Sequence, residues 1–474
     1  MVLNKVLTNI SGGYLPMFQA RLYQKEAIKF FANNNGRVLI SLPPGAGKTF
    51  IAMYTRYLCA DLRTTVILCP ASIRIQWYNE WRKFFPKDKV LLYDPNKLED
   101  LSKYDCIILN YEKLGIKVNG KNFIDNIGIN FNYLIIDECH FVKNPESSRG
   151  DLSFKLSQKA DRVMLLSGTP VTNRVTDLWN QFRILNPQAI GSLSTFKQLF
   201  CSRHLEIIKT KQGNRKVWKE DNKVTNIESL KRLISMFVFF RDERAVYKEM
   251  PPIQKVVVPL ELDTQSILEY KNILNSVKDI TNESLTNIES IISSMRLRIG
   301  LSKVDPAVEW IKNFLNSSTD GTKLVIFGYH RKVVELLYKK LSMYNPALVY
   351  GGMSDNDKNL NVSKFCKDNT CRLFIGNISS AGTGLDGLNT VSNKCVFVEY
   401  SYSAAEQKQA EGRIRRTNSK YSNYLSYYLF ADGTIDSTIF DIIDSKAKTS
   451  SEIFEKRELN PEELLSILKK CIRG

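Results

Sequence analysis

The sequence predicts an α/β protein made of two lobes in tandem, each built on a parallel sheet. Short apolar segments alternate with helix-like segments along the chain, which is typical of βαβ units. A polar, helix-like stretch at residues 263–300 separates two such series. The predicted strands of the first series are "RVLISL" (37–42), "TVILCP" (65–70), "CIILN" (106–110), "YLIIDE" (133–138) and "RVMLLS" (162–167). Those of the second are "KLVIFGY" (323–329), "ALVYGG" (347–352), "RLFIGN" (372–377), "CVFVEY" (395–400) and "LSYYLF" (425–430).

Length and composition favour a folded chain of two or three domains. The chain has 474 residues, which is too long for one ordinary core. Of these residues 43% are hydrophobic and 24% are charged, a composition that is too apolar for a disordered chain. No apolar run approaches the roughly 20 residues that span a bilayer, and the start of the chain lacks the apolar core of a signal peptide. We therefore expect an intracellular protein that does not enter membranes.

The net charge indicates the class of partner, and the cysteine content indicates whether disulfides or zinc sites are expected. The formal net charge is +18, an excess that favours a polyanionic partner such as nucleic acid, although solubility alone is the alternative. Nine cysteines occur without a C-x-x-C pair, and there are only three histidines. This usage predicts reduced thiols and argues against a disulfide framework or a structural zinc site.

The segment "SLPPGAGKTF" (41–50) follows the first predicted strand and reads as a P-loop. A strand, a glycine-containing turn and a helix that opens with Lys48 and Thr49 present backbone N–H groups to phosphates. The pattern departs from the usual one because Leu42 occupies the first glycine position. A glycine-rich turn without a ligand is the alternative, and the flanking strand and helix argue against it. The predicted nucleotide-binding residues here are Pro44, Gly45, Ala46, Gly47, Lys48 and Thr49.

The segment "DECH" (137–140) ends the buried strand "YLII" in two adjacent carboxylates. A nucleotide on a P-loop needs Mg²⁺ and an oriented water, and a carboxylate pair at a neighbouring strand end supplies both. We expect Asp137, with Thr49, to hold Mg²⁺ partly through water, and Glu138 to accept a proton from the attacking water. Solvated acids at a strand end are the alternative. The predicted cofactors are ATP and Mg²⁺.

Together with these two motifs, four further segments resemble those of superfamily-two DExH-box helicases. In that family a glutamine placed like Gln24 in "RLYQKEAI" (21–28) reads adenine, and "LSGTPVTN" (166–173) resembles motif III. "SSAGTGLDG" (379–387) resembles motif V, and "QAEGRIRR" (409–416) resembles motif VI. The resemblance implies two RecA-like parallel-sheet lobes in tandem with a nucleotide cleft between them. It also implies nucleotide contacts from Gly384 and Asp386, catalytic Arg413 and Arg416 acting from the second lobe, and coupling of hydrolysis to nucleic-acid grip by His140, Ser167 and Thr169.

Longer segments resemble the Swi/Snf-type branch of these motors, closest to the compact annealing-helicase-like and phage or viral members. They are "ILCPASIRIQWYNEWRKF" (67–84), "DECHFVKNPESSR" (137–149) and "SGTPVTNRVTDLWNQFRIL" (167–185). The resemblance implies an ATP-dependent DNA translocase or helicase that remodels branched DNA by fork reversal, branch migration, annealing or unwinding. An RNA helicase and a non-catalytic nucleic-acid-binding protein are the alternatives. No accessory chromatin-reading module accompanies the motor, so a role in chromatin is not expected. We expect a monomer, located in the cytoplasm of a prokaryote or of a phage- or virus-infected cell rather than in a nucleus.

The expected domains follow from these motifs. They are a first lobe at 1–245 with a helical and hairpin insertion at about 175–245, a linker and helical segment at 246–306, a second lobe at 307–445 and a C-terminal helical segment at 446–474.

The resemblance also implies nucleic-acid contacts from residues around motifs Ia, Ib, IV and V. A separate candidate is the basic segment 203–220, which reads as a hairpin able to grip phosphates or stack a base; a solvated hairpin with a packed tryptophan is the alternative. Cys139 is predicted to be a packing residue rather than a nucleophile. The predicted contacts are Pro70, Ala71, Gln76, Asn110, Tyr111, Tyr329, His330, Ser379 and Thr383, with Lys211, Arg215 and Trp218 on the hairpin.

Overall fold

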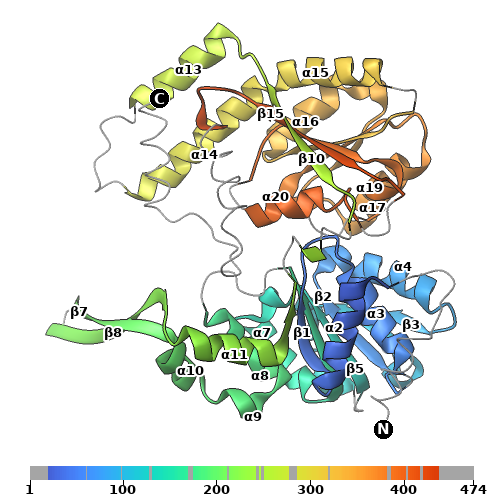
Figure 1. The fold of residues 1–474 in the computed structure, drawn as a ribbon, viewed down its shortest axis with the longest axis vertical. Coiled ribbons are helices and arrows are strands. Elements are labelled where there is room, and N and C mark those ends of the chain that lie inside the picture. Colours follow the sequence, from blue (N-terminus) through green and yellow to red (C-terminus); the bar gives the residue numbers. More distant parts are fainter. Residues whose placement is uncertain are drawn as a thin grey trace. The chain divides into compact units, whose positions relative to one another are not determined.

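The chain divides into two compact units, Met1–Val246 and Tyr247–Gly474, each with its own parallel sheet (Figure 1). The computed structural model describes residues 20–59, 61–97, 99–127, 131–168, 175–210, 213–241, 245–246, 250–276, 285–318, 321–381, 386–401, 404–416 and 420–436. The predicted C-terminal helical segment lies outside these ranges. Among the described residues, no helix combines the length and the apolar character needed to cross a membrane.

The first unit contains a seven-stranded, fully parallel sheet in the order β3-β4-β2-β5-β6-β1-β9. The central strands are buried along their whole length, which is why they read as unbroken apolar runs rather than as alternating ones. The five predicted strands are present, and β3 and β9 join them. The bounds are β1 (Arg37–Ser41), β2 (Thr65–Cys69), β3 (Val90–Leu92), β4 (Cys106–Asn110), β5 (Phe131–Asp137), β6 (Ala160–Ser167) and β9 (Val238–Phe240).

Helices lie between most of these strands along the chain, as parallel pairing requires of the connections. Polar N-caps begin several of them; for example, the Ser147 hydroxyl accepts a hydrogen bond from the Gly150 N–H at the start of α7. Their bounds are α2 (Leu22–Asn33), α3 (Lys48–Leu58), η1 (Ala71–Ile73), α4 (Arg74–Phe84), η2 (Leu101–Lys103), α5 (Tyr111–Leu114), α6 (Phe123–Asn126), η3 (Cys139–Val142), α7 (Ser148–Ser157), α8 (Asp177–Leu185), α9 (Pro187–Ile190), α10 (Leu193–Phe200) and α11 (Ile227–Phe237).

A separate antiparallel hairpin forms from β7 (Cys201–Thr210) and β8 (Gly213–Val224) (Figure 1). The register pairs Leu205 with Trp218 and Ile208 with Arg215. The strands are longer than the short pair expected from the sequence, because pairing extends to Cys201 and Val224. Lys211 lies outside the described residues. The segment expected as an insertion also contributes β9 to the main sheet, where it pairs with β1.

The second unit contains a six-stranded, fully parallel sheet in the order β10-β15-β14-β11-β13-β12. The fold class predicted from the sequence, two parallel-sheet α/β units, is therefore confirmed. The bounds are β10 (Ile253–Pro259), β11 (Leu324–Gly328), β12 (Ala347–Val349), β13 (Leu373–Asn377), β14 (Lys394–Phe397), β15 (Tyr424–Phe430), α13 (Thr264–Ser276), α14 (Leu285–Ser302), α15 (Val304–Ser317), α16 (Arg331–Lys340), η5 (Ser342–Tyr344), α17 (Asp355–Lys367), α18 (Ile378–Ala381), α19 (Leu388–Val391) and α20 (Ala404–Glu411).

The stretch 246–306, expected to be a linker and helical segment, is built into this second unit. Strand β10 pairs with β15 along its whole length, and Pro259 is tolerated there because β10 is an edge strand. Helix α14 packs Ile292, Met295 and Ile299 into the core. The sequence did not predict this because polar residues interrupt the apolar face of α14, so the stretch reads as a polar helix.

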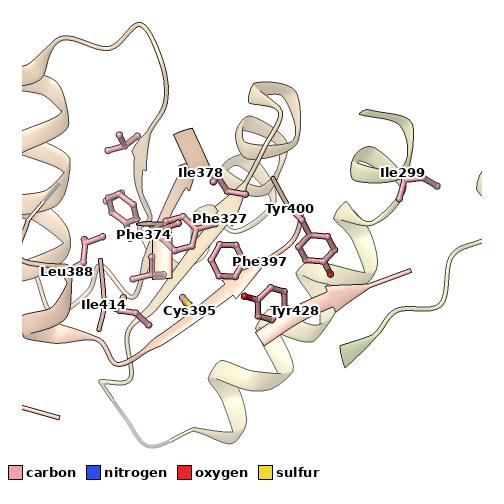
Figure 2. Packing of buried hydrophobic residues seen from close by; sticks show 14 of the residues in the cluster. Ile299, Phe327, Phe374, Ile378, Leu388, Cys395, Phe397, Tyr400, Ile414 and Tyr428 are labelled. Atoms are coloured by element: carbon pink, nitrogen blue, oxygen red, sulfur yellow. The ribbon is translucent and has the colours of Figure 1, made fainter. Parts of the chain in front are cut away.

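Two hydrophobic layers cover the two faces of the second sheet. Side chains alternate along β11, so that Val325 and Phe327 enter one layer while Leu324 and Ile326 enter the other. In the first layer, Phe327, Phe397 and Tyr428 form a row with ring centroids 5.0 and 5.2 Å apart (Figure 2). This layered core supports the strand ends that carry the second unit's predicted site residues.

A buried ion pair fixes the junction of α14 and α15. Lys303 Nζ donates to Asp436 Oδ2 at 2.5 Å and to the Leu429 carbonyl at 3.2 Å, and its side chain is fully buried. Burial raises the pKa of Asp436, and Lys303 opposes that rise. Removing one partner would leave the other charge buried without compensation.

We expect Lys303→Met to destabilise the second unit by about 3–5 kcal/mol, since breaking a buried pair costs that much. Urea unfolding at neutral pH measures the loss. The double variant Lys303→Met/Asp436→Leu is the control and should recover most of the stability, because it removes both charges. Equal stability of the single variant and the natural chain would contradict the structural role of the pair.

Candidate functional site

The carboxyl ends of three adjacent strands form the candidate site in the first unit. Strand β6 lies between β1 and β5, with Ser41 of β1 opposite Ser167 and Asp137 of β5 opposite Leu166. Parallel strands present their carboxyl ends at one edge, where ligands bind in open α/β sheets. The P-loop, the "DECH" segment and the predicted motif III therefore begin at the same edge.

The P-loop turn has the backbone shape that its glycines permit. Gly45 and Gly47 both have φ of +78°, in the left-handed region, and Gly47 caps α3. Leu42 is not among the residues with positive φ; it is buried, and its N–H donates to the Ser167 carbonyl at 3.2 Å. The first glycine of the usual pattern is therefore not required here, since the chain still continues the strand.

Lys48 and Gln24 both contact the backbone of this turn. Lys48 Nζ donates to the Leu42 carbonyl at 2.9 Å. Gln24 is buried, with its Nε2 donating to the Ala46 carbonyl at 3.1 Å and its Oε1 accepting from the Arg21 N–H at 3.0 Å. The Tyr23 hydroxyl donates to the same Ala46 carbonyl at 2.9 Å. In this structure Gln24 thus braces the P-loop, and its contact with adenine stays a prediction.

Asp137 is held at three of its atoms at the end of β5. Its Oδ2 accepts a hydrogen bond from Trp77 Nε1 at 2.8 Å, and its Oδ1 accepts one from the Glu138 N–H at 2.9 Å. Its carbonyl accepts one from the Tyr111 hydroxyl at 2.6 Å. The carboxylate is therefore fixed in direction before any ligand binds.

Burial controls the protonation of Asp137. Burial, followed by the negative charge of Glu138, raises the pKa of Asp137 to about 6. The Trp77 hydrogen bond and the positive charge of Lys48 act in the opposite direction. This effect of Lys48 indicates that the charges of the P-loop lysine and the Asp137 carboxylate are close enough to interact.

Glu138 and His140 form the polar side of the box. Among the residues that the structure describes, Glu138 is one of few non-glycine residues in the left-handed region. Its φ is +51° and its ψ is +55°, a strained conformation that often marks a functional residue. Glu138 Oε2 lies 3.3 Å from His140 Nδ1. His140 therefore touches the predicted base, while its predicted coupling to motif III stays a prediction because Thr169 lies outside the described residues.

Cys139 is a packing residue, as the sequence predicted. It is fully buried, and its Sγ donates to Gln181 Oε1 of α8 at 3.6 Å. Burial raises the pKa of the Cys139 thiol well above its ordinary value, so the reactive thiolate is disfavoured. Helix α8 also supports η3, since Asn180 Nδ2 donates to the Val142 carbonyl at 2.6 Å.

The predicted nucleic-acid contacts of the first unit divide by exposure. Pro70 and Ala71 directly follow β2 and Gln76 lies in α4; each is partly or fully exposed. Asn110 and Tyr111 are buried, and each already has protein partners: Asn110 Oδ1 accepts from Arg74 Nη1 at 3.3 Å, and the Tyr111 hydroxyl is bonded to Asp137. Their contact with the nucleic-acid strand stays a prediction, and in this structure Tyr111 supports the box residue Asp137.

The contact between Trp77 and Asp137 was not predicted from the sequence, although Trp77 lies in the segment 67–84 that resembles the Swi/Snf-type branch. A tryptophan four residues before another, Trp81, reads as a core helix face, and both are indeed buried. Nothing in the spacing indicates that one indole reaches Asp137, because that contact joins residues 60 positions apart.

In the second unit, a buried carboxylate shapes the loop after β11. Glu399 Oε2 accepts hydrogen bonds from the N–H groups of Tyr329 and His330 at 2.8 and 2.9 Å, and its Oε1 lies 2.6 Å from His330 Nδ1. Asn377 Nδ2 donates to the Tyr329 carbonyl at 2.8 Å. The Arg296 guanidinium lies 4.0 Å from the Tyr329 ring centroid. The two predicted strand-contacting residues are thus held rigidly at the edge of the second sheet.

Of the remaining predicted residues of the second unit, Ser379, Asp386, Arg413 and Arg416 are among the described residues. Arg416 Nη1 lies 2.8 Å from Asp386 Oδ1, so the segments that resemble motifs V and VI meet through two predicted site residues. Ser379 is exposed and Arg413 is partly exposed. Thr383 and Gly384 lie outside the described residues, as do the side chains of Arg215 and Trp218.

The residues of the first unit fit the predicted cofactors. Two left-handed glycines open the turn before α3, and a helix N-terminus with its N–H groups attracts phosphate. Mg²⁺ prefers oxygen ligands and commonly takes one carboxylate together with phosphate oxygens. The Thr49 hydroxyl and the Asp137 carboxylate are donors of that type.

Comparisons with known proteins show which ones the chain resembles. Residues 23–304 match the SNF2-related domain family, and residues 306–418 match the helicase conserved C-terminal domain. The human "DNA annealing helicase and endonuclease ZRANB3" is 26% identical over 471 residues, covering 95% of this chain and 42% of the human protein. A Caenorhabditis elegans homologue of "SWI/SNF-related matrix-associated actin-dependent regulator of chromatin subfamily A-like protein 1" is 25% identical, covering 91% of this chain and 61% of its own.

The chain thus spans less than two thirds of the length of either relative. Among solved structures, "Sulfolobus solfataricus SWI2/SNF2 ATPase core in complex with dsDNA" aligns with a TM-score of 0.42 and 22% identity, covering 91% of this chain and 92% of that chain.

We expect Asp137→Asn to change how stability depends on pH. The folded chain binds the Asp137 proton up to a pH of about 6, whereas an unfolded aspartate releases it near about 3.9. The natural chain therefore loses stability as pH rises from about 4 to about 6, and the variant lacks this loss. The variant should gain up to about 3 kcal/mol relative to the natural chain over that range.

Urea unfolding of both proteins at a series of pH values measures this difference. Asp61→Asn, at an exposed position, provides a control substitution of the same type, and its unfolding is measured over the same pH series. A constant difference between Asp137→Asn and the natural chain from pH 4 to pH 7 would show that Asp137 titrates normally.

Proposed function

Because the chain belongs to the SNF2-related domain family, we propose that it hydrolyses ATP to move along DNA. The observation that carries this proposal is the shared edge of β1, β6 and β5, where the P-loop and the "DECH" box begin with β6 between them. Burial raises the pKa of Asp137 and the positive charge of Lys48 opposes that rise, so the two charges interact as those of a lysine and a carboxylate around one nucleotide would.

The proposed reaction transfers the terminal phosphoryl group of ATP to water. Lys48 and the N–H groups at the start of α3 bind the phosphates, and Thr49 and Asp137 hold Mg²⁺. The metal, when bound, neutralises phosphate charge. Glu138 accepts one proton from water as its oxygen attacks phosphorus, and the bond to the ADP oxygen breaks, giving ADP and inorganic phosphate.

Arginines of the second unit complete the proposed catalytic set. Charge develops on the transferred phosphoryl group, and a planar, permanently charged guanidinium is suited to stabilise it. We propose this role for Arg413 and Arg416. The ion pair between Arg416 and Asp386 supports it, since it holds one guanidinium in a defined direction.

Duplex and branched DNA is the proposed track. The net charge of +18 favours a phosphate backbone as partner, and a relative of the chain is named a DNA annealing helicase. In this proposal Pro70, Ala71 and Gln76 contact the strand in the first unit, and Tyr329 and His330 contact it in the second. Stepping at a junction would then migrate or reverse the branch.

Two alternative functions, an RNA motor and a non-catalytic nucleic-acid-binding protein, make different demands on the predicted site residues. An RNA motor would use the same catalytic residues, so only the choice of activating nucleic acid separates it from a DNA motor. A non-catalytic binding protein would have no need for Lys48 or Glu138. The strained backbone at Glu138 favours a catalytic role, since such strain usually persists only where function requires it.

We expect Lys48→Ala and Glu138→Gln each to lower the ATPase rate by about a hundredfold or more, the usual effect of losing a catalytic base or charge. Glu138→Gln should still bind ATP, because Asp137 and the P-loop are intact. Steady-state phosphate release and nucleotide binding measure the two effects. The exposed Glu146 supplies the matched control, and Glu146→Gln should retain the natural rate. Near-natural hydrolysis by Glu138→Gln would remove its assignment as base.

We expect duplex and forked DNA to stimulate the ATPase more than RNA does. Binding should weaken steeply with salt and depend little on base sequence, because phosphate contacts release counterions. ATPase titrations with duplex DNA, forked DNA, single-stranded DNA and RNA at several salt concentrations test this. Equal or stronger stimulation by RNA at every salt concentration would favour the RNA motor instead.

A further inference from the structure

Helix α4 carries two buried tryptophans, one turn apart, that make the same type of hydrogen bond. Trp77 Nε1 donates to Asp137 Oδ2 at 2.8 Å, and Trp81 Nε1 donates to Asp88 Oδ2 at 3.0 Å. Trp77 is 1% exposed and Trp81 is 0% exposed. The acceptors differ in kind: Asp137 is the proposed metal-binding carboxylate, whereas Asp88 forms an ion pair with Arg56 at 2.9 Å.

The contact from Trp77 limits the positions that the Asp137 carboxylate can adopt. An ionised carboxylate has about four lone-pair positions. The indole of Trp77 uses one on Oδ2, and the Glu138 N–H uses one on Oδ1. One lone-pair position on each oxygen is then left for a metal ion or its water.

An indole is well suited to this task. Its N–H is a donor only, so the indole cannot itself bind the metal ion, as an oxygen or an imidazole nitrogen could. It is neutral, so it directs the carboxylate without pairing its charge, as a lysine or arginine would. Its buried ring has little freedom, and a group that orients a metal ligand from behind typically changes metal affinity by about 10–100-fold when removed.

We propose that Trp77 is a positioning residue that orients the Asp137 carboxylate for binding of Mg²⁺ with nucleotide. The inference rests on the proposed function, because it assigns Asp137 to the metal. Trp77 touches neither nucleotide nor metal in this role, and it acts through the carboxylate alone. Trp81, in the same helix, has a purely structural role.

The test compares Trp77→Phe with Trp81→Phe in the full chain. Both changes keep an aromatic ring and remove one buried N–H donor, so their structural costs should be similar. Calorimetry measures the affinity of a non-hydrolysable ATP analogue with Mg²⁺ and with EDTA. The Mg²⁺ concentration that gives half of the maximal ATPase rate is the second readout, and melting temperatures of all proteins are recorded.

Trp77→Phe should weaken analogue binding in Mg²⁺ by about tenfold or more, and raise the half-maximal Mg²⁺ concentration by a similar factor. Its affinity in EDTA should stay within about twofold of the natural chain, as expected of a change that acts only through a metal ligand. Trp81→Phe should match the natural chain in all three readouts even if its melting temperature falls.

Three results would overturn the inference. Equal losses in both variants would assign the effect to the packing of α4, and equal affinity of Trp77→Phe and the natural chain in Mg²⁺ would leave Trp77 without a role at Asp137. Tighter Mg²⁺ binding by Trp77→Phe would mean that the indole occupies the metal's own position. Natural protein whose nucleotide binding does not respond to Mg²⁺ would instead refute the proposed function, so the two failures are distinguishable.

A second substitution separates the donor from the ring. Trp77→His keeps a ring N–H but loses more volume than Trp77→Phe. If the donor matters, Trp77→His should bind the analogue in Mg²⁺ more tightly than Trp77→Phe despite a lower melting temperature. The reverse order would assign the effect to packing. Should Trp77→Phe fail to fold, Trp77→His against Trp81→His gives the same comparison of metal-dependent binding.

Discussion

The parallel pairing of β1, β6 and β5 is the constraint on which the candidate site depends. Because the three strands run in the same direction, their carboxyl ends lie at one edge, and the loops that follow them must start there. The P-loop turn, the left-handed Glu138 and the end of β6 are each local features, but only this pairing makes them neighbours. The Leu42 N–H bonded to the Ser167 carbonyl extends the same ladder into the P-loop itself.

Asp137 shows the balance between burial and charge at this edge. Burial alone would favour the neutral acid, and its elevated pKa reflects that cost. The surroundings offset the cost without cancelling the charge, since Trp77 and the Glu138 N–H are neutral donors and Lys48 acts from the P-loop. A carboxylate in this state is held in direction and still attracts a cation, which is the property that a Mg²⁺ ligand requires.

The second unit uses a buried carboxylate in a related way. Glu399 accepts hydrogen bonds from two consecutive backbone N–H groups and so sets the course of the loop that carries Tyr329 and His330. Gly300 of α14 lies against it, where an added Cβ would come within 2.2 Å of Glu399 Oε1. In both units, therefore, a buried acid beyond or at a strand end gives a surface loop a fixed shape, and the apolar layers behind the sheet hold that acid in place.

The sequence by itself determined the strands, the P-loop and the carboxylate pair, because buried parallel strands are continuous apolar runs and the glycines and acids follow them directly along the chain. Tertiary structure alone decided which polar groups support those residues. Trp77 lies 60 positions from Asp137, and Glu399 lies 70 from Tyr329. The same reason explains why β10 was assigned to a linker: the strand with which it pairs, β15, comes from a distant part of the chain. Local patterns record the period of a strand or a helix, whereas contacts between distant elements depend on how the sheet orders them.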